Sequence, residues 1–166
     1  MKTRKLTMTA LFAALVCIAT MFIHLPVPMT GGYVHIGDAF IYLAAAMLPM
    51  PYAMAASAIG AGLADAFSGY VVYVLPTVII KALLILPFSA KGDKIITLRT
   101  LAASIVASVI GIAGYFVADW IIYTNMATAL ANMFAGMVQP FSSIVVFVAL
   151  GYALDKSNVK KRFNLN

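Results

Sequence analysis

The sequence predicts an all-α integral membrane protein, a prediction that rests on its composition, its long uncharged runs and its clustered basic residues. Of the 166 residues, 64% are hydrophobic and 10% are charged, and the mean hydropathy is +1.02. A soluble domain carries about 25% charged residues. Several uncharged runs approach or exceed the roughly 18 to 20 residues that a spanning helix needs. We therefore expect a single transmembrane domain over residues 1–166.

Proline, glycine and aspartate residues divide the apolar runs into six predicted spans. The first follows a basic N-terminus, and it is interpreted as a retained span rather than a secretory signal because no convincing cleavage site follows it. The second has about a dozen residues, which cover under about two thirds of a 30 Å hydrocarbon core. It must be tilted, partly re-entrant or continued by the turn at 49–51. The predicted spans are 8–25, 37–48, 51–67, 70–88, 100–123 and 129–154.

Basic residues predict the topology. Ten of the eleven Lys and Arg residues lie in the N-terminus, in one loop at 90–99 and in the C-terminal tail. Because Lys and Arg concentrate in cytoplasmic loops, both termini and this loop are predicted to be cytoplasmic. The loops at 26–35, 68–70 and 124–128 are then external, and they hold no Lys or Arg.

Three of the five acidic residues, Asp38, Asp65 and Asp119, fall near the external ends of predicted spans. An aspartate within the hydrocarbon region costs a few kcal/mol unless it meets water, a partner or a ligand. Their shared depth predicts an external pocket. The alternative is that each carboxylate ends a helix at the level of the lipid headgroups.

Aromatic residues accompany these acids at helical spacing. Tyr115, Asp119 and Tyr123 recur every four residues on the fifth predicted span, with Trp120 beside them. Rings can stack on a planar heterocycle while carboxylates accept its N–H or O–H groups, as in a mostly apolar pocket with a few placed polar groups. The alternative for Trp120 and Tyr123 is an aromatic belt at the membrane interface.

The second, fourth and sixth predicted spans add further polar side chains. Asp38 and Tyr42 are four residues apart, and Asn132, Gln139 and Ser143 share one face of the sixth span. Buried amides in lipid must find partners, either on another helix or on a ligand. Pro140 is expected to bend this span. The predicted substrate-binding residues are His35, Asp38, Tyr42, Asp65, Tyr73, Tyr115, Asp119, Trp120, Tyr123, Asn132 and Gln139.

Lys81 is the one basic residue inside a predicted span. It lies about 10 Å from the cytoplasmic end of that span at 1.5 Å per residue. Its apolar stem could carry the ammonium towards the headgroups. We favour this arrangement, or an ion pair, over ligand binding.

Several motifs are absent. The sequence contains no G-x-x-x-x-G-K-[ST] phosphate loop, and it cannot contain H-E-x-x-H because it has no Glu. Its single Cys17 provides no cysteine metal site. We therefore predict no cofactor, no metal and no catalytic residues, and no basic patch suited to nucleic acid. A pocket-bearing membrane protein without its own energy source is expected to depend on partner subunits.

Small residues recur on the first and third predicted spans. Ala10 and Ala14 form an Ala-x-x-x-Ala stripe, and Ala58, Gly62 and Ala66 share a face. Such stripes allow helices to approach closely in lipid.

Together with the six spans, the basic termini and the segment "PMTGGYVHIGDAFIYLAAAMLPMPYAMAASAIGAGLADAFSGY", these features resemble the substrate-binding S components of energy-coupling factor (ECF) vitamin transporters. The resemblance implies that Ala10 and Ala14 dock on the transmembrane coupling (T) subunit. It implies that the loop containing Gly31 and Gly32 gates an external pocket, and that two cytoplasmic ATPases power uptake. It also implies a multi-pass location in a bacterial or archaeal plasma membrane.

The acidic, tyrosine-rich pocket favours an uncharged or cationic ring that is rich in hydrogen-bond donors. A thiamin-precursor pyrimidine, thiamin, pyridoxine and a queuosine-related base fit this description, and riboflavin remains possible. Pantothenate, biotin and folate fit less well because they carry carboxylates.

Two other classes of function are alternatives. The chain could be a small membrane enzyme or accessory that uses His35 and Asp38 as an acid–base or metal pair. Their spacing places them on one face if the helix already includes His35. A purely structural membrane subunit is the third option, and it gives no reason for the polar external cluster.

Overall fold

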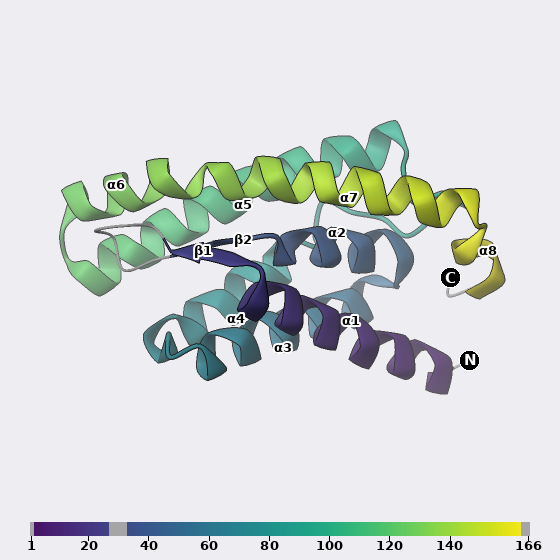
Figure 1. The fold of residues 1–166 in the computed structure, drawn as a ribbon, viewed down its shortest axis with the longest axis horizontal. Helices are drawn as coiled ribbons and strands as arrows, with labels where there is room; N and C mark the ends of the chain where they lie inside the picture. Colours follow the sequence, from purple (N-terminus) through teal and green to yellow (C-terminus); the bar gives the residue numbers. More distant parts are fainter. Residues whose placement is uncertain (1, 27–32, 164–166) are drawn as a thin grey trace.

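The computed structural model describes residues 2–26 and 33–163, and its long helices run along one common axis (Figure 1). Every predicted span contains a helix, which confirms the all-α class apart from a two-stranded hairpin of three-residue strands. The described elements are α1 (Lys2–Phe22), β1 (His24–Pro26), β2 (Tyr33–His35), α2 (Gly37–Met47), α3 (Met50–Phe67), the 3-10 helix η1 (Val71–Tyr73), α4 (Val74–Leu83), α5 (Leu98–Tyr123), α6 (Met126–Gly136), α7 (Val138–Lys156) and α8 (Val159–Phe163).

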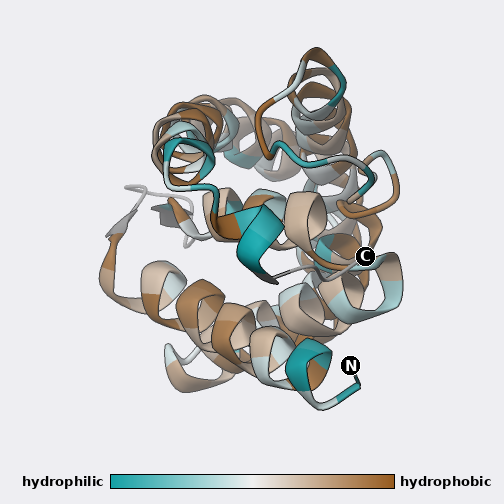
Figure 2. Cartoon of the chain, turned by 90° about the vertical axis from the view of Figure 1, so that its right-hand side faces the viewer, coloured by the Kyte–Doolittle hydropathy of each residue, from teal (hydrophilic) through white to brown (hydrophobic). Residues whose placement is uncertain are grey.

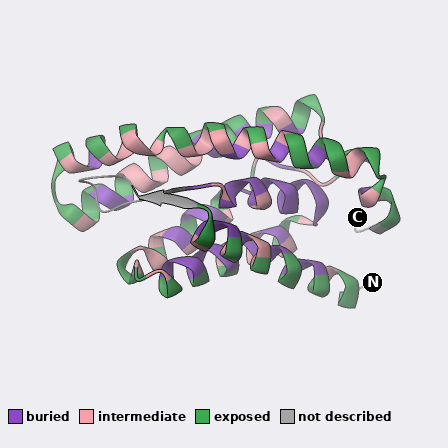
Figure 3. Cartoon of the chain, viewed as in Figure 1, coloured by how far each residue is buried: buried purple, intermediate pink, exposed green. Residues whose placement is uncertain are grey.

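Three helical stretches among the described residues are long and apolar enough to cross a membrane, namely Lys2–Phe22, Leu98–Tyr123 and Met126–Lys156. Gly37–Met47 and Val71–Leu83 are shorter apolar helices. Many large apolar side chains are exposed, so the outer surface of the bundle suits lipid. Exposed positions lie along the outer helices in Figure 3. The count of six spans stays a prediction.

The short helix α2 lies in the core of the bundle. Its residues are buried except for the partly buried Phe40, and α1, α3 and α7 pack around it (Figure 3). A helix that is apolar all round is stable in such a buried position. The strands β1 and β2 pair antiparallel, and β2 leads directly into α2. The hairpin therefore continues the path of α2 towards one end of the molecule, as Figure 1 shows.

The fourth predicted span is shorter than expected. α4 ends at Leu83. After it the backbone forms turns with hydrogen bonds between residues three apart, the last of which runs from the Phe88 N–H to the Ile85 carbonyl. Pro87 explains this end, because it has no N–H to donate and its ring restricts the preceding residue.

The sixth predicted span is broken into two helices. α6 ends at Gly136 and α7 begins at Val138. Pro140 follows the break and cannot donate a helical hydrogen bond to the Gly136 carbonyl, four residues earlier. The Asn125 side chain caps α6 by accepting from the N–H groups of Ala127 and Thr128.

The closest approach of α1 to α3 occurs at Gly60. A Cβ built at Gly60 would lie 2.5 Å from the Ala13 carbonyl oxygen and 2.9 Å from the Val16 Cβ. The predicted small-residue stripe of α3 does not make this contact. Its Gly62 faces Val78 of α4, and Ala66 is exposed.

Polar and basic chain segments gather at one end of the bundle, which we call the basic end and define by both termini, α8 and the 84–97 connection (Figures 1 and 2). The Asp155 carboxylate accepts hydrogen bonds from the Ile95 and Ile96 N–H groups at 2.7 and 2.8 Å, which ties α7 to this connection. We call the opposite end, which holds β1, β2 and the α5–α6 junction, the hairpin end. Which side of the membrane each end faces stays a prediction. Residues 27–32 of the expected gate, including Gly31 and Gly32, lie outside the described residues.

Candidate functional site

Two neighbouring cavities of about 120 and 80 Å³ lie inside the bundle. Both are bounded by Tyr115 and Asp119 of α5, by Asn132 and Gly136 of α6 and by Gln139 of α7. The larger cavity also reaches α3, η1 and α4, whereas the smaller reaches α2. The five shared residues make the two cavities parts of one candidate binding site.

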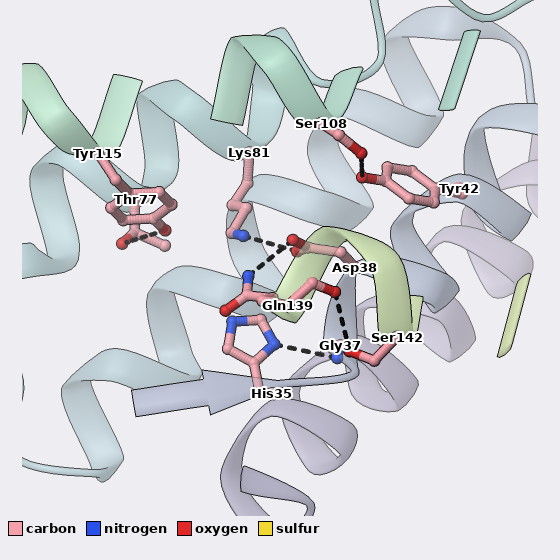
Figure 4. A network of polar contacts seen from close by, with 10 residues as sticks. All are labelled: His35, Gly37, Asp38, Tyr42, Thr77, Lys81, Ser108, Tyr115, Gln139 and Ser142. Atoms are coloured by element: carbon pink, nitrogen blue, oxygen red, sulfur yellow. Dashed lines mark hydrogen bonds and ion pairs between the residues drawn. The ribbon is translucent and has the colours of Figure 1, made fainter. Parts of the chain in front are cut away.

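Asp38, Lys81 and Gln139 form a buried polar triad (Figure 4). Lys81 lines the larger cavity, Asp38 lines the smaller one, and Gln139 lines both. The Lys81 Nζ donates to Asp38 Oδ1 at 2.6 Å, and the Gln139 Nε2 donates to Asp38 Oδ2 at 2.8 Å. The side chains of Lys81 and Asp38 are only 1% and 7% exposed. Three helices, α2, α4 and α7, thereby meet at one carboxylate. The ion pair that the sequence left as one option for Lys81 is therefore present, and the ammonium does not extend to the headgroups.

Tyr115 of α5 contacts two side chains of α4, namely Lys81 of the triad and Thr77. The Lys81 Nζ lies 5.1 Å from the centre of the Tyr115 ring, within the range of a cation–π contact. The Tyr115 hydroxyl lies 3.0 Å from Thr77 Oγ1 (Figure 4). Thr77 and Lys81 are four residues apart and so project from one face of α4.

Asp119 is held at the other side of the larger cavity. The Tyr73 hydroxyl donates to Asp119 Oδ1 at 2.6 Å and lies 3.1 Å from the Tyr123 hydroxyl. Asp119 is 6% exposed, whereas Tyr123 is 36% exposed and does not line either cavity. The carboxylate is thus oriented within the site by a tyrosine of η1.

Tyr42 closes the smaller cavity towards the basic end. Its hydroxyl lies 3.2 Å from Ser108 Oγ, and its ring stacks on Phe88 at a centroid distance of 5.5 Å. Phe147 contacts both rings edge-on. This packing gives Tyr42 one orientation, with its polar end on α5.

Gly37 begins α2 in a crowded place. Its N–H donates to His35 Nδ1 at 3.0 Å (Figure 4). A Cβ at Gly37 would collide with Thr20 Oγ1 and would lie 2.9 Å from His35 Nδ1. Since α2 begins after His35, the condition for placing His35 and Asp38 on one helical face is not met. Both oxygens of Asp38 are already engaged by Lys81 and Gln139.

Nine of the eleven predicted binding residues line one or both cavities. Trp120 does not, because it points out of the bundle and is 49% exposed. One step along a helix turns the side chain by about 100°, so Trp120 faces away from the site that Asp119 enters. The alternative of an interfacial belt for Trp120 and Tyr123 stays a prediction.

Sequence reasoning did not assign Lys81, Thr77 or Thr20 to the pocket, although all three line the larger cavity. A signal for two of them was present. Tyr73, Thr77 and Lys81 recur every four residues, the same spacing that identified Tyr115 and Asp119 on α5. Thr20 of α1 has no comparable pattern.

Comparison with known proteins identifies the family of this chain. The model of the family described as "ECF-type riboflavin transporter, S component" matches residues 1–156. A protein from Pyrococcus woesei described as "Uncharacterized protein in gap 3'region" is 29% identical over 143 residues, which cover 85% of this chain and 95% of that protein. The family match includes every helix that contributes to the two cavities. The chain therefore belongs to the family of ECF-type riboflavin transporter S components.

Proposed function

We propose that this chain is the substrate-binding subunit of an ECF-type importer and that it binds a small heterocyclic micronutrient in the two connected cavities. Family membership makes it a transport subunit rather than an enzyme. The observation that carries the proposal is the convergence of polar side chains from α2 to α7 on two neighbouring cavities within an apolar bundle. Buried polar groups in a membrane protein are expensive and mark substrate sites.

The charge of the lining supports an uncharged or cationic substrate. One lysine, Lys81, faces three aspartates in the combined lining, and it is paired with one of them. A carboxylate ligand would add a further anion to this site. We therefore favour rings such as a thiamin-precursor pyrimidine, thiamin, pyridoxine, a queuosine-related base or riboflavin over pantothenate, biotin and folate.

The partners follow from the family. We propose that the chain associates with an ECF T subunit and two cytoplasmic ATPases in a bacterial or archaeal plasma membrane. Ala10 and Ala14 support a docking role because both are exposed on α1. Small exposed residues would let a partner helix approach closely.

Mass spectrometry of ligand carried through purification tests the proposal most directly. We expect a heterocycle to remain bound in mild detergent, and the same compound to raise the melting temperature of ligand-free protein. Binding of ligand to the folded state alone stabilises it by mass action. Absence of any ligand, together with no melting shift across a panel of the vitamins named above, would contradict the proposal.

Asp119→Asn is expected to weaken substrate binding about 10- to 100-fold, because hydrogen bonds to a charged group contribute about 1.5–3 kcal/mol. Tyr73 would still be able to donate to the new amide oxygen, so the fold should persist. Isothermal titration with the identified ligand measures the change. The control is Ile121→Ala on the outer face of α5, where the side chain is 69% exposed. Equal affinity in both variants would remove Asp119 from the site.

Cysteine labelling in intact cells tests the topology. In a Cys17→Ser background no other cysteine is present. A cysteine introduced in place of Gly32 is expected to react with an impermeant maleimide from outside, and a cysteine in place of Ala90 to react only after the membrane is permeabilised. The opposite pattern would invert the orientation.

A further inference from the structure

We propose that the Lys81 ammonium is the hydrogen-bond donor that recognises a carbonyl oxygen of an uncharged ligand, and that Asp38 sets this selectivity by neutralising the ammonium. The inference rests on the proposed function, and it narrows the class of substrate. It assigns Lys81 a binding role that its position within an apolar helix did not predict.

The first argument is the number of donors on Lys81. An ammonium has three N–H bonds, and in the described part of the chain only one acceptor, Asp38 Oδ1, lies within hydrogen-bond distance. Because the three bonds diverge, the other two point away from Asp38. Lys81 is 1% exposed and lines the larger cavity. Buried donors without acceptors are costly, so an acceptor on the ligand would relieve this cost.

The second argument is the charge around Lys81. Asp38 lies 2.6 Å from the ammonium and is fixed from its other side by Gln139. The pair has no net charge, and Asp65 and Asp119 line the same cavity. A carboxylate would meet an ammonium that is already neutralised and two further acids nearby. A neutral carbonyl accepts the same hydrogen bond and adds no charge.

The third argument concerns two other polar groups that line the same cavity as Lys81. Asn132 Oδ1 is a buried acceptor, and Thr20 Oγ1 is a buried hydroxyl that can donate or accept. Both residues line the larger cavity, and neither atom has a hydrogen-bond partner within residues 2–26 and 33–163. A ligand edge that carries a carbonyl next to an N–H offers an acceptor for the ammonium and a donor for an acceptor such as the amide oxygen, and both protein groups line this cavity. The chemical class is therefore a lactam or cyclic imide.

This class divides the candidate substrates. Riboflavin and a deazapurine base carry a ring carbonyl beside an N–H. Thiamin and pyridoxine carry no ring carbonyl. The structure therefore favours the first two as ligands and disfavours the last two.

The main test uses a charge-free double variant, Lys81→Met with Asp38→Asn. It removes the donors without leaving a buried charge unpaired, and the amide oxygen introduced by Asp38→Asn can still accept from Gln139. Titration with riboflavin and 7-deazaguanine is expected to show at least about tenfold weaker binding than the wild type, because a hydrogen bond to a charged group is lost. Thiamin and pyridoxine, whose binding to the wild type should already be weak, are expected to show no further loss.

Asp38→Asn alone tests the role of charge. With the ammonium no longer neutralised, the ratio of affinities for pterin-6-carboxylate and for pterin is expected to rise at least about tenfold, because an unpaired buried cation favours an anion. Melting temperature and gel filtration establish whether each variant folds. If Asp38→Asn fails to fold, the double variant decides.

The outcomes separate this inference from the proposed function. If the wild type binds neither these probes nor any other vitamin, the proposed function fails. If the wild type binds a lactam and the double variant keeps that affinity, Lys81 is not the donor and only the inference is overturned. The inference is also overturned if the wild type binds thiamin or pyridoxine more tightly than both riboflavin and 7-deazaguanine.

Discussion

Lys81→Met alone is expected to lower the free energy of unfolding by roughly 3–5 kcal/mol, the range observed when one partner of a buried ion pair is removed. The substitution would leave Asp38 inside the bundle with only the Gln139 amide as a described hydrogen-bond donor. The side chain of Asp38 is 7% exposed, so bulk solvent compensates the carboxylate poorly for the lost ammonium. Thermal unfolding in detergent, followed by circular dichroism, measures the loss.

The double variant Lys81→Met with Asp38→Asn tests whether the unpaired carboxylate causes the stability loss of Lys81→Met. It contains no buried charge at these positions, so we expect it to recover most of the lost stability. Lys91→Met, at an exposed lysine in the 84–97 connection, is the control for removing a positive charge in general and should change stability little. Equal melting temperatures for the single and double variants would show that the unpaired carboxylate of Asp38 is not the cause of the lost stability.

Gly60→Leu is expected to separate α1 from α3 and to cost about 1–3 kcal/mol or more, as overpacking of a tight contact does. Even the first carbon of the new side chain would lie 2.5 Å from the Ala13 carbonyl oxygen, where backbone must move to make room. The α1–α3 interface is the most extensive between any two described helices. We expect a lower melting temperature, and weaker ligand binding because Thr20 and Ala61 of these helices line the larger cavity.

Ala66→Leu is the matched control for Gly60→Leu. It adds the same bulky apolar side chain to the same helix, but on a face that is exposed in the bundle. Its effect should remain within about 0.5 kcal/mol. If both substitutions destabilise the protein equally, the cost comes from α3 itself and not from its contact with α1.

Hydrophobic patterning predicted where the helices lie but not how they end. The six apolar segments each contain a helix because composition alone determines that such segments leave water. The early end of α4 was not predicted, although Pro87 gave a local reason for it. The β-hairpin was missed because three-residue strands are too short for a periodic signal, and they exist here through pairing with each other.

Helical spacing predicted much of the candidate site. The four-residue spacing of Asp38 with Tyr42 and of Tyr115 with Asp119 brings each pair to the cavities. Adjacency in sequence misled the prediction for Trp120, which follows Asp119 yet faces outwards. Spacing could not show that Lys81 pairs with Asp38, because the two residues lie on different helices and are 43 positions apart in the sequence.

The order in which the ribosome makes the chain gives the Asp38–Lys81 pair another consequence. Asp38 is synthesised 43 residues before the lysine that neutralises it. Inserting an aspartate into a lone apolar helix costs up to about 2.5–3.5 kcal/mol, the value at the helix centre, and Asp38 lies in the first turn of α2. Until α4 emerges, α2 therefore gains little by entering lipid, and it is better kept where water or the insertion machinery can reach its carboxylate. Once Lys81 arrives, α2 and α4 can enter the bilayer as a neutral unit, which makes integration of these two helices a coupled event during biogenesis.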